Sequence, residues 1–89
     1  MEVSVVIPTY NERENVKPLV EAIEDELKGR DFELIFVDDD SPDGTAELIK
    51  EMQEEKKFLR LIERKGKNGI GSAYKKGLNE AKGEKIVQM

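Results

Sequence analysis

Short apolar runs rich in branched residues alternate with segments of helical periodicity along this chain. The first run covers residues 3–7 and ends at Pro8, and later runs cover residues 32–37, 58–62 and 85–89. A near-continuous β-branched run is typical of a strand that is buried on both faces, as in a parallel sheet. Strands that alternate with helices connect through right-handed crossovers, so the pattern predicts a parallel α/β sheet.

Three amphipathic segments fill the spaces between the apolar runs. In the first, apolar residues recur at helical spacing from Val16 onward, and Asn11 with Glu14 predicts the capping pair that starts this helix. The second segment begins near Thr45, after a turn sequence, and the third opens at residues 69–72. The sequence therefore predicts a Rossmann-like sheet of about four parallel strands in the order 3-2-1-4, flanked by three helices.

Composition excludes several classes of function. The chain carries 20 acidic and 15 basic residues and no basic stripe, so sequence-independent binding to nucleic acid is not expected. It has no cysteine and no histidine, which excludes thiolate metal sites and removes the commonest general base. No apolar run approaches the ~20 residues of a membrane span, and the N-terminus lacks the regions of a signal peptide, so we expect a cytoplasmic location. The excess of Glu and Lys is compatible with a thermophilic source.

Polar residues follow the first two predicted strands at the place where doubly wound sheets bind their ligands. Such ligands lie outside the carboxyl ends of the strands, where the strand order reverses. The reversal falls here between the first and fourth strands, so residues 8–12 and 38–41 should meet beside whatever follows Met89. The topology therefore predicts a binding site at this edge of the sheet.

Three consecutive aspartates follow the second predicted strand. Adjacent carboxylates repel one another, at a cost that stability alone would not select. We favour Asp39 as an acceptor of hydrogen bonds from a ribose diol, because a strand-2 acid does this in dinucleotide-binding folds. Asp43 is better explained as a cap of the second helix, and capping is the alternative for the triplet as well. Asp38 is equally compatible with a buried carboxylate bonded to loop amides.

The first loop lacks the G-x-G-x-x-G turn of dinucleotide-binding folds and carries Pro-Thr-Tyr-Asn-Glu at residues 8–12 instead. A glycine-rich turn lets pyrophosphate approach the backbone, whereas this bulky loop offers a nucleobase the aromatic face of Tyr10 and the carboxylate of Glu12. A carboxylate suits a guanine edge because that edge presents adjacent N–H donors. A half-buried packing role for Tyr10 and a first-turn helix charge for Glu12 are equally compatible with the sequence.

The third loop gives weaker signals. Gly71 belongs to a loop-to-helix turn, and Lys65 and Lys67 beside it can either meet a diphosphate or remain solvated. Gly77 predicts close packing of the third helix onto the sheet. Tyr74 is better explained by core or edge packing than by contact with a ligand.

Three segments together resemble the family 2 glycosyltransferases, whose fold is called GT-A. They read PTYNEREN at residues 8–15, VDDDSPDGT at residues 37–45 and GIGSAYKKG at residues 69–77. Within the family they are most similar to the dolichol-phosphate mannosyltransferases. The resemblance implies a transferase that binds GDP-mannose, inverts the anomeric centre and delivers mannose to dolichyl phosphate at the cytoplasmic face of a membrane.

The resemblance also implies site residues. Those expected to contact the guanine are Pro8, Tyr10 and Glu12. Those expected to flank the nucleoside are Val37 and Asp39, and further candidates are Asp40, Lys67 and Gly71. No catalytic residue and no metal ligand is expected among residues 1–89.

The D-x-D metal motif of the family follows the fourth strand directly. The chain ends at Met89 within that strand, so residues 1–89 are interpreted as the N-terminal nucleotide-binding part of a GT-A domain, truncated before the motif. Mg²⁺ or Mn²⁺ would serve the whole enzyme, because a leaving diphosphate needs a cation to take up its charge. We expect the 89-residue chain to bind no metal tightly and to lack transferase activity.

Several alternatives remain open at this point. Another family 2 transferase, including a polyprenyl-phosphate glucosyltransferase, would use a UDP-sugar. A receiver-like domain also places acids at strand ends, and a dehydrogenase-type cofactor domain shares the sheet. The remaining possibility is a purely structural fragment of a fold that binds no ligand. Independently, the fourth strand would form an exposed apolar edge, so we expect this chain to dimerise or to swap domains.

Overall fold

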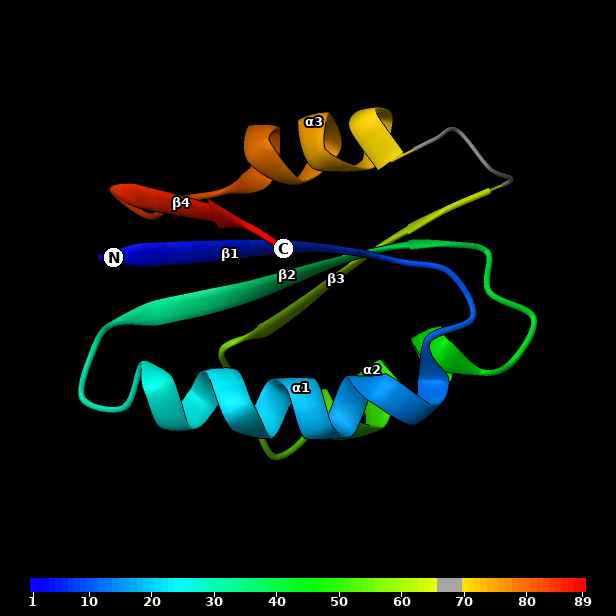
Figure 1. Cartoon of the computed structure of the whole chain (residues 1–89), viewed down its shortest axis with the longest axis horizontal. Coiled ribbons are helices and arrows are strands. Elements are labelled where there is room, and N and C mark those ends of the chain that lie inside the picture. Colours follow the sequence, from blue (N-terminus) through cyan, green and yellow to red (C-terminus); the bar gives the residue numbers. More distant parts are fainter. Residues whose placement is uncertain (66–69) are drawn as a thin grey trace.

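The computed structural model describes residues 1–65 and 70–89. The elements follow the predicted order: β1 (Val3–Thr9), α1 (Arg13–Glu26), β2 (Phe32–Asp39), α2 (Thr45–Gln53), β3 (Leu59–Arg64), α3 (Ile70–Glu80) and β4 (Lys85–Gln88). The strands form one sheet in the order β3-β2-β1-β4, and each neighbouring pair is parallel (Figure 1). The predicted strand order 3-2-1-4 is therefore confirmed.

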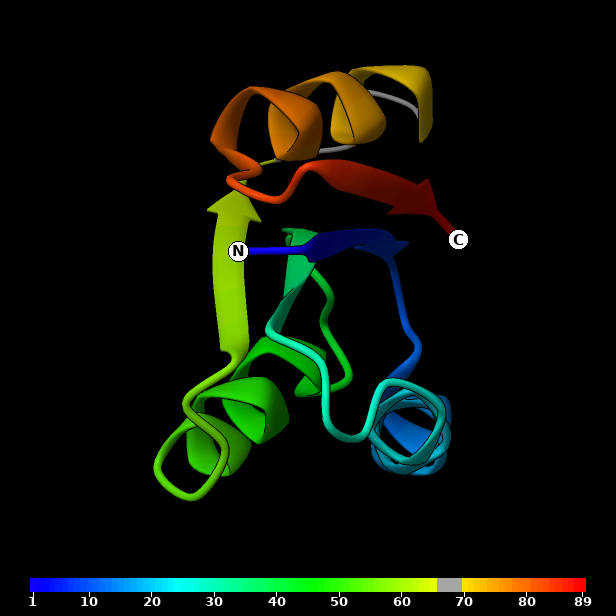
Figure 2. The same cartoon turned by 90° about the vertical axis from the view of Figure 1, so that its left-hand side faces the viewer.

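Helices cover both faces of the sheet, with α1 and α2 on one side and α3 on the other (Figure 2). Successive side chains of a strand point to opposite faces, so β1 contributes to two separate clusters. Val3 and Val5 pack in the cluster that includes Val16 of α1, whereas Val6 packs in the cluster that includes Ala73 of α3. This double coverage explains why the strands are apolar almost throughout.

Helix α3 packs closely on the sheet at Gly77. A Cβ atom at this position would lie 2.2 Å from a methyl group of Val6, Cγ1, which is far inside van der Waals contact. The prediction of close packing at Gly77 is therefore confirmed. The approach holds the first turns of α3 above the carboxyl ends of β1 and β2, where the polar loops lie (Figure 1).

A buried carboxylate ties the opposite end of α3 to the sheet. Glu33 of β2 is 2% exposed and accepts hydrogen bonds from the Ser4 hydroxyl at 2.6 Å, the Lys82 backbone N–H at 2.8 Å and Arg60 Nη1 at 2.9 Å. Burial alone would raise the pKa of Glu33, but these donors and the charge of Arg60 outweigh it, so the pKa lies below the usual value of 4.5. The network joins three strands and the connection that leads into β4.

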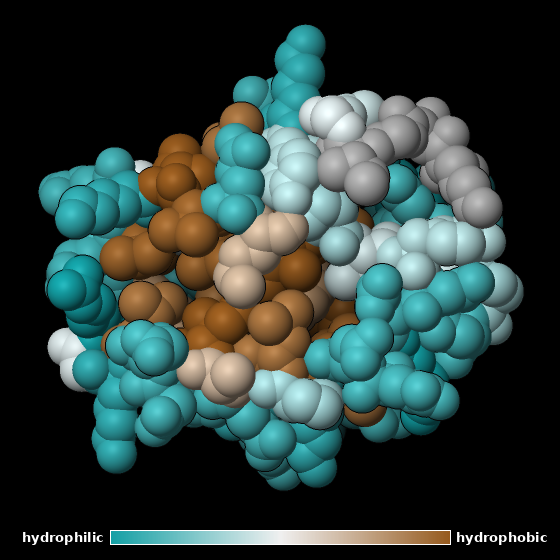
Figure 3. Space-filling view, viewed as in Figure 1, coloured by the Kyte–Doolittle hydropathy of each residue, from teal (hydrophilic) through white to brown (hydrophobic). Residues whose placement is uncertain are grey.

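Strand β4 is the terminal strand of the sheet and pairs with β1 alone among the described strands. Ile86 is 43% exposed and Val87 is 44% exposed. An apolar trough of about 310 Å³ lies between β4 and α1, with Leu19, Leu27 and Val87 in its walls, and Figure 3 shows hydrophobic side chains gathered on this face. Within the described residues, no helix combines the length and the apolar character that a membrane crossing needs.

Candidate functional site

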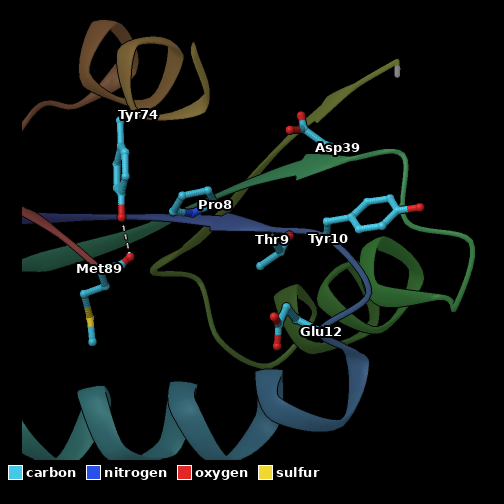
Figure 4. A pocket seen from close by; sticks show the side chains of 7 residues that line it. All are labelled: Pro8, Thr9, Tyr10, Glu12, Asp39, Tyr74 and Met89. Atoms are coloured by element: carbon cyan, nitrogen blue, oxygen red, sulfur yellow. Dashed lines mark hydrogen bonds between the residues drawn. The ribbon is translucent and has the colours of Figure 1, made fainter. Parts of the chain in front are cut away.

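A cavity of about 330 Å³ opens at the carboxyl end of β1, between β2 and β4 (Figure 4). The side chains that line it are Pro8, Thr9, Tyr10, Glu12, Asp39, Tyr74 and Met89. They come from β1 and its loop, from β2, from α3 and from the residue after β4. The cavity therefore occupies the place where the strand order reverses, as the topology predicts.

Four of the predicted site residues meet in this cavity. They are Pro8, Tyr10, Glu12 and Asp39. Figure 4 shows Asp39 on the α3 side of β1 and Glu12 on the α1 side, so the two carboxylates stand on opposite sides of the strand end. A ligand in the cavity would lie across the end of β1, with hydrogen-bond acceptors on both flanks.

The other predicted site residues lie elsewhere. Val37 is fully buried beside Val6 in the core, so its side chain is not available to a ligand in this structure. Asp40 is exposed next to the cavity with a φ of 55°, and Gly71 is exposed in the first turn of α3, but neither lines the cavity. Lys67 lies outside the described residues.

Asp39 is held by an arginine that the sequence analysis did not single out. Arg64 Nε donates to Asp39 Oδ1 at 2.6 Å and Nη2 donates to Oδ2 at 2.8 Å, while Nη1 donates to the Ser72 hydroxyl at 2.7 Å. The hydrogen bonds and the charge of Asp39 raise the pKa of Arg64. Asp39 and Arg64 are paired in the parallel register, each at the end of its strand. The pair could therefore have been predicted from the sequence, because an acidic and a basic residue follow two neighbouring predicted strands.

Asp38 has a structural role in joining the two loops. It is 1% exposed and accepts hydrogen bonds from the Thr9 hydroxyl at 2.6 Å, the Ser41 hydroxyl at 2.7 Å and the Ser41 backbone N–H at 3.1 Å. This is the buried carboxylate that the sequence left as one option for Asp38. Only Asp39 of the three consecutive aspartates reaches the cavity.

Side chains of the second loop hold the backbone of the first. The backbone N–H of Asn11 donates to Ser41 Oγ at 2.9 Å, that of Glu12 donates to Thr45 Oγ1 at 3.2 Å, and that of Arg13 donates to Asp43 Oδ2 at 3.2 Å. Asp43 also accepts a hydrogen bond from the Thr45 backbone N–H, the first of α2, at 3.1 Å, although the N-cap position itself is Gly44. The Thr45 hydroxyl is the main cause that lowers the pKa of Asp43. The second loop thereby sets the position of the first loop, which carries Tyr10 and Glu12.

The predicted capping pair of Asn11 and Glu14 is wrong. Helix α1 begins at Arg13, and its N-cap residue Glu12 makes no side-chain cap hydrogen bond. Asn11 has a φ of 55°, a left-handed conformation that asparagine tolerates better than most residues. The first N–H of the helix, that of Arg13, bonds instead to Asp43 in the second loop, which is 30 residues away in the chain. A long-range cap of this kind leaves no local sequence signature.

The cavity can bind a planar group that carries hydrogen-bond donors. Tyr10 supplies an aromatic ring, and Glu12 and Asp39 supply acceptors. Among residues 1–65 and 70–89, however, no three carboxylates come together to hold a metal ion, and both oxygens of Asp39 are engaged by Arg64. The described residues thus do not fit a divalent cation.

A parallel sheet in this order, with an acid-lined cavity at its switch point, defines a doubly wound α/β domain, a class that binds its ligands at this place. The model of Glycosyl transferase family 2 matches residues 4–89, and the chain belongs to that family. Membership sets aside the receiver-like and dehydrogenase-type alternatives. It also confirms the resemblance that the three sequence segments indicated.

One relative is the dolichol-phosphate mannosyltransferase of Pyrococcus furiosus. It is 45% identical over 89 residues, which cover all of this chain and 25% of the relative. Two solved structures share the fold. The Staphylococcus aureus protein TarS 1-349 in complex with UDP-GlcNAc has a TM-score of 0.87 at 27% identity and matches 100% of this chain and 26% of its own. The mannosyltransferase PcManGT from Pyrobaculum calidifontis, in complex with GDP-Man and Mn²⁺, has a TM-score of 0.79 at 27% identity. The match covers 96% of this chain and 26% of PcManGT. These likenesses confirm the expected GT-A fold. This chain spans about a quarter of the length of each of the three proteins.

Proposed function

We propose that the protein containing this chain transfers mannose from GDP-mannose to dolichyl or another polyprenyl phosphate, and that residues 1–89 form its nucleotide-binding part. The observation that carries the proposal is the convergence of Tyr10, Glu12 and Asp39 in one cavity at the switch point of the sheet. The name of the Pyrococcus furiosus relative supports the reaction. The GDP-Man in the PcManGT complex supports the donor.

The cavity residues suit a guanosine. Tyr10 offers its ring to the base, and Pro8 shapes the wall beside it. In this proposal, Glu12 accepts hydrogen bonds from the adjacent N–H donors of the guanine edge, and Asp39 accepts from the base or from a ribose hydroxyl. Because acceptors stand on both flanks of β1, the nucleoside would bridge the two loops.

The reaction needs little acid–base help from these residues. An acceptor phosphate is already an anion near neutral pH, so its oxygen can form the new bond to the anomeric carbon without a general base. The bond from that carbon to GDP breaks at the same time, and GDP leaves with the electron pair, which inverts the anomeric centre. The absence of histidine from the chain is compatible with this chemistry. Mg²⁺ or Mn²⁺ would stabilise the leaving diphosphate in the whole protein.

A UDP-sugar donor is the second candidate. TarS in complex with UDP-GlcNAc aligns with a TM-score of 0.87, above the 0.79 of the PcManGT complex. A carboxylate can accept from the single imide N–H of uracil as well as from guanine, so the cavity residues alone do not separate the two bases. Parallel titrations with GDP and UDP separate them directly.

The test is calorimetric titration of GDP into the full-length protein. We expect Glu12→Gln and Asp39→Asn each to weaken GDP binding by about tenfold or more, since each replaces a charged acceptor by an amide. Glu14→Gln is the matched control, because Glu14 lies exposed in the first turn of α1 and outside the cavity. Unchanged GDP affinity in both cavity variants would refute the proposal.

The proposal extends to location and to partners. A lipid-linked acceptor would place the protein at the cytoplasmic face of a membrane, which fractionation of cells into membrane and soluble pools would test. We also propose that the isolated 89-residue chain associates with itself through β4, because Ile86 and Val87 are exposed on a terminal strand.

A further inference from the structure

We propose that Arg64 is a positioning and specificity-determining residue of the nucleotide cavity. By pairing with Asp39, it fixes that carboxylate as an acceptor and balances its charge, so the pair suits the neutral donors of a nucleoside and does not suit a cation. The inference rests on the proposed function, since it concerns how the same cavity selects its ligand.

The geometry of the pair fixes the carboxylate in place. Arg64 Nε and Nη2 bond to the two oxygens of Asp39 at 2.6 and 2.8 Å, which is the two-pronged arrangement that only a guanidinium can provide. The third nitrogen bonds to Ser72 in the first turn of α3, so the guanidinium itself is anchored. The side chains of Asp39 and Arg64 are 11% and 12% exposed, and this burial strengthens the interaction.

The pairing changes what Asp39 can recognise. Each carboxylate oxygen has two acceptor positions, and Arg64 occupies one on each oxygen, so a ligand N–H or O–H can still bond to the others. The charge of Asp39 is balanced by Arg64, so an incoming nucleoside diphosphate meets less repulsion than it would from a lone carboxylate. For the same reason, the pair offers a cation little attraction.

The chain contains a matched control pair on the same two strands. Arg60 of β3 bonds to Glu33 of β2 at 2.9 Å, and this pair faces α3 like the first one. Glu33 precedes Asp39 by six residues of β2, roughly 20 Å along a strand. Neither Arg60 nor Glu33 lines the cavity. A change at Arg60 therefore disturbs a cross-strand ion pair of the same type without touching the proposed site.

The experiment compares wild type, Arg64→Lys, Arg64→Gln and Arg60→Lys in the full-length protein. Calorimetry measures the affinity for GDP and for guanosine, and thermal unfolding confirms that each variant folds. Arg64→Lys keeps the charge but loses the fork, so both affinities should fall by a similar factor, about tenfold. Arg64→Gln removes the charge, so GDP should lose more affinity than guanosine, and the extra loss should shrink at high salt. Arg60→Lys should change the melting temperature and leave both affinities within about twofold.

A double variant provides the rescue. Asp39→Asn in the Arg64→Gln background replaces the ion pair by two amides without net charge, so it should regain part of the GDP affinity that Arg64→Gln alone has lost. Wild type that binds neither ligand would end the proposed function itself. Wild type that binds, together with Arg64 variants that bind equally well, would overturn only the role of Arg64. Equal losses in the Arg60 and Arg64 variants would also overturn it, because they would indicate a general structural effect.

Discussion

The carboxylate of Asp39 and the guanidinium of Arg64 meet through two hydrogen bonds of 2.6 and 2.8 Å, at the paired ends of β2 and β3. The acid that marks the end of the second strand is therefore not an isolated charge in the cavity. Its orientation depends on β3 and, through Ser72, on the first turn of α3. The cavity thus depends on all four strands and on α3, because β3 holds Asp39 through Arg64.

Asp38→Ala should destabilise the fold by about 1–3 kcal/mol. The change leaves the buried Thr9 hydroxyl and the Ser41 backbone N–H without their acceptor, and an unsatisfied buried donor carries roughly that cost. Urea denaturation measures the loss. Asp40→Asn is the control, because this residue is exposed and asparagine accepts the φ of 55°; its effect should stay within about 0.5 kcal/mol. Equal stability of Asp38→Ala and wild type would contradict the structural role of Asp38.

Asp43→Ala should weaken GDP binding although Asp43 lies outside the cavity. The side chain accepts hydrogen bonds from the Thr45 and Arg13 backbone N–H groups, so its loss frees the loop that carries Tyr10 and Glu12. The measurement is calorimetry with GDP, alongside the melting temperature. Asp43→Asn keeps an acceptor oxygen and should recover much of the loss in affinity. A variant that melts earlier but binds GDP with unchanged affinity would show that the loop is held by other contacts.

Gly77→Ala should cost about 1–3 kcal/mol, because the added methyl group would lie 2.2 Å from Val6 Cγ1 and α3 would have to move. Denaturation of the variant tests this. Gly71→Ala is the matched change in the same helix: nothing lies within 4 Å of the added atom, so stability should hold or rise. Trimming the opposing side chain with Val6→Ala should reduce the cost of Gly77→Ala. Additive effects of the two changes would argue against the contact.

Glu33 should make stability depend on acid pH. Its pKa in the folded protein is lowered, so its ionised form favours folding above the unfolded-state pKa, and this contribution is lost as pH falls through the folded-state pKa. The difference in unfolding free energy between wild type and Glu33→Gln should be constant from pH 7 to about 5. It should then shrink below the usual glutamate pKa of 4.5. Denaturation curves across this range measure it, and a difference that grows on acidification would reverse the sign of the inference.

Tyr74→Phe should loosen the end of β4. The Tyr74 hydroxyl donates to the Met89 carbonyl at 2.5 Å, and a single neutral hydrogen bond contributes about 0.5–1.5 kcal/mol. Amide hydrogen exchange should become faster in β4, while the amides of β2 in the centre of the sheet keep their protection. Faster exchange throughout the sheet would instead indicate a global loss of stability.

The isolated 89-residue chain should self-associate, and it should show no mannosyl transfer. Ile86 and Val87 lie exposed on a terminal strand beside an apolar trough, which favours pairing between edges. Sedimentation over a range of concentrations measures association, and Val87→Lys should reduce it because a charge blunts a strand edge. A monomer at every concentration would count against the proposal. Metal-dependent transfer by the isolated chain would contradict the expected inactivity.

The elements and their order were predictable from the chain because the signals are local. Periodicity within each segment distinguishes strands from helices, and the handedness of crossovers then leaves few arrangements of parallel strands. The same logic placed Pro8, Tyr10, Glu12 and Asp39 at one end of the sheet, where the structure brings them together. Tyr74, expected only to pack, also lines the cavity, since α3 crosses above the end of β1.

What the sequence determined by itself is the alternation of strands and helices, the parallel order and the meeting of the first two loops. Only the tertiary structure decided which partner each polar side chain takes. Asp39 pairs with Arg64 across 25 residues, and the first turn of α1 is capped by Asp43 across 30. Val37 and Asp39 share one face of β2, but Val37 is buried there with Val6 and Ala73, whereas Asp39 ends the strand and reaches the cavity. Local patterns fix backbone conformation through near neighbours, whereas hydrogen-bond partners depend on register and on helix placement, which the whole packed sheet settles.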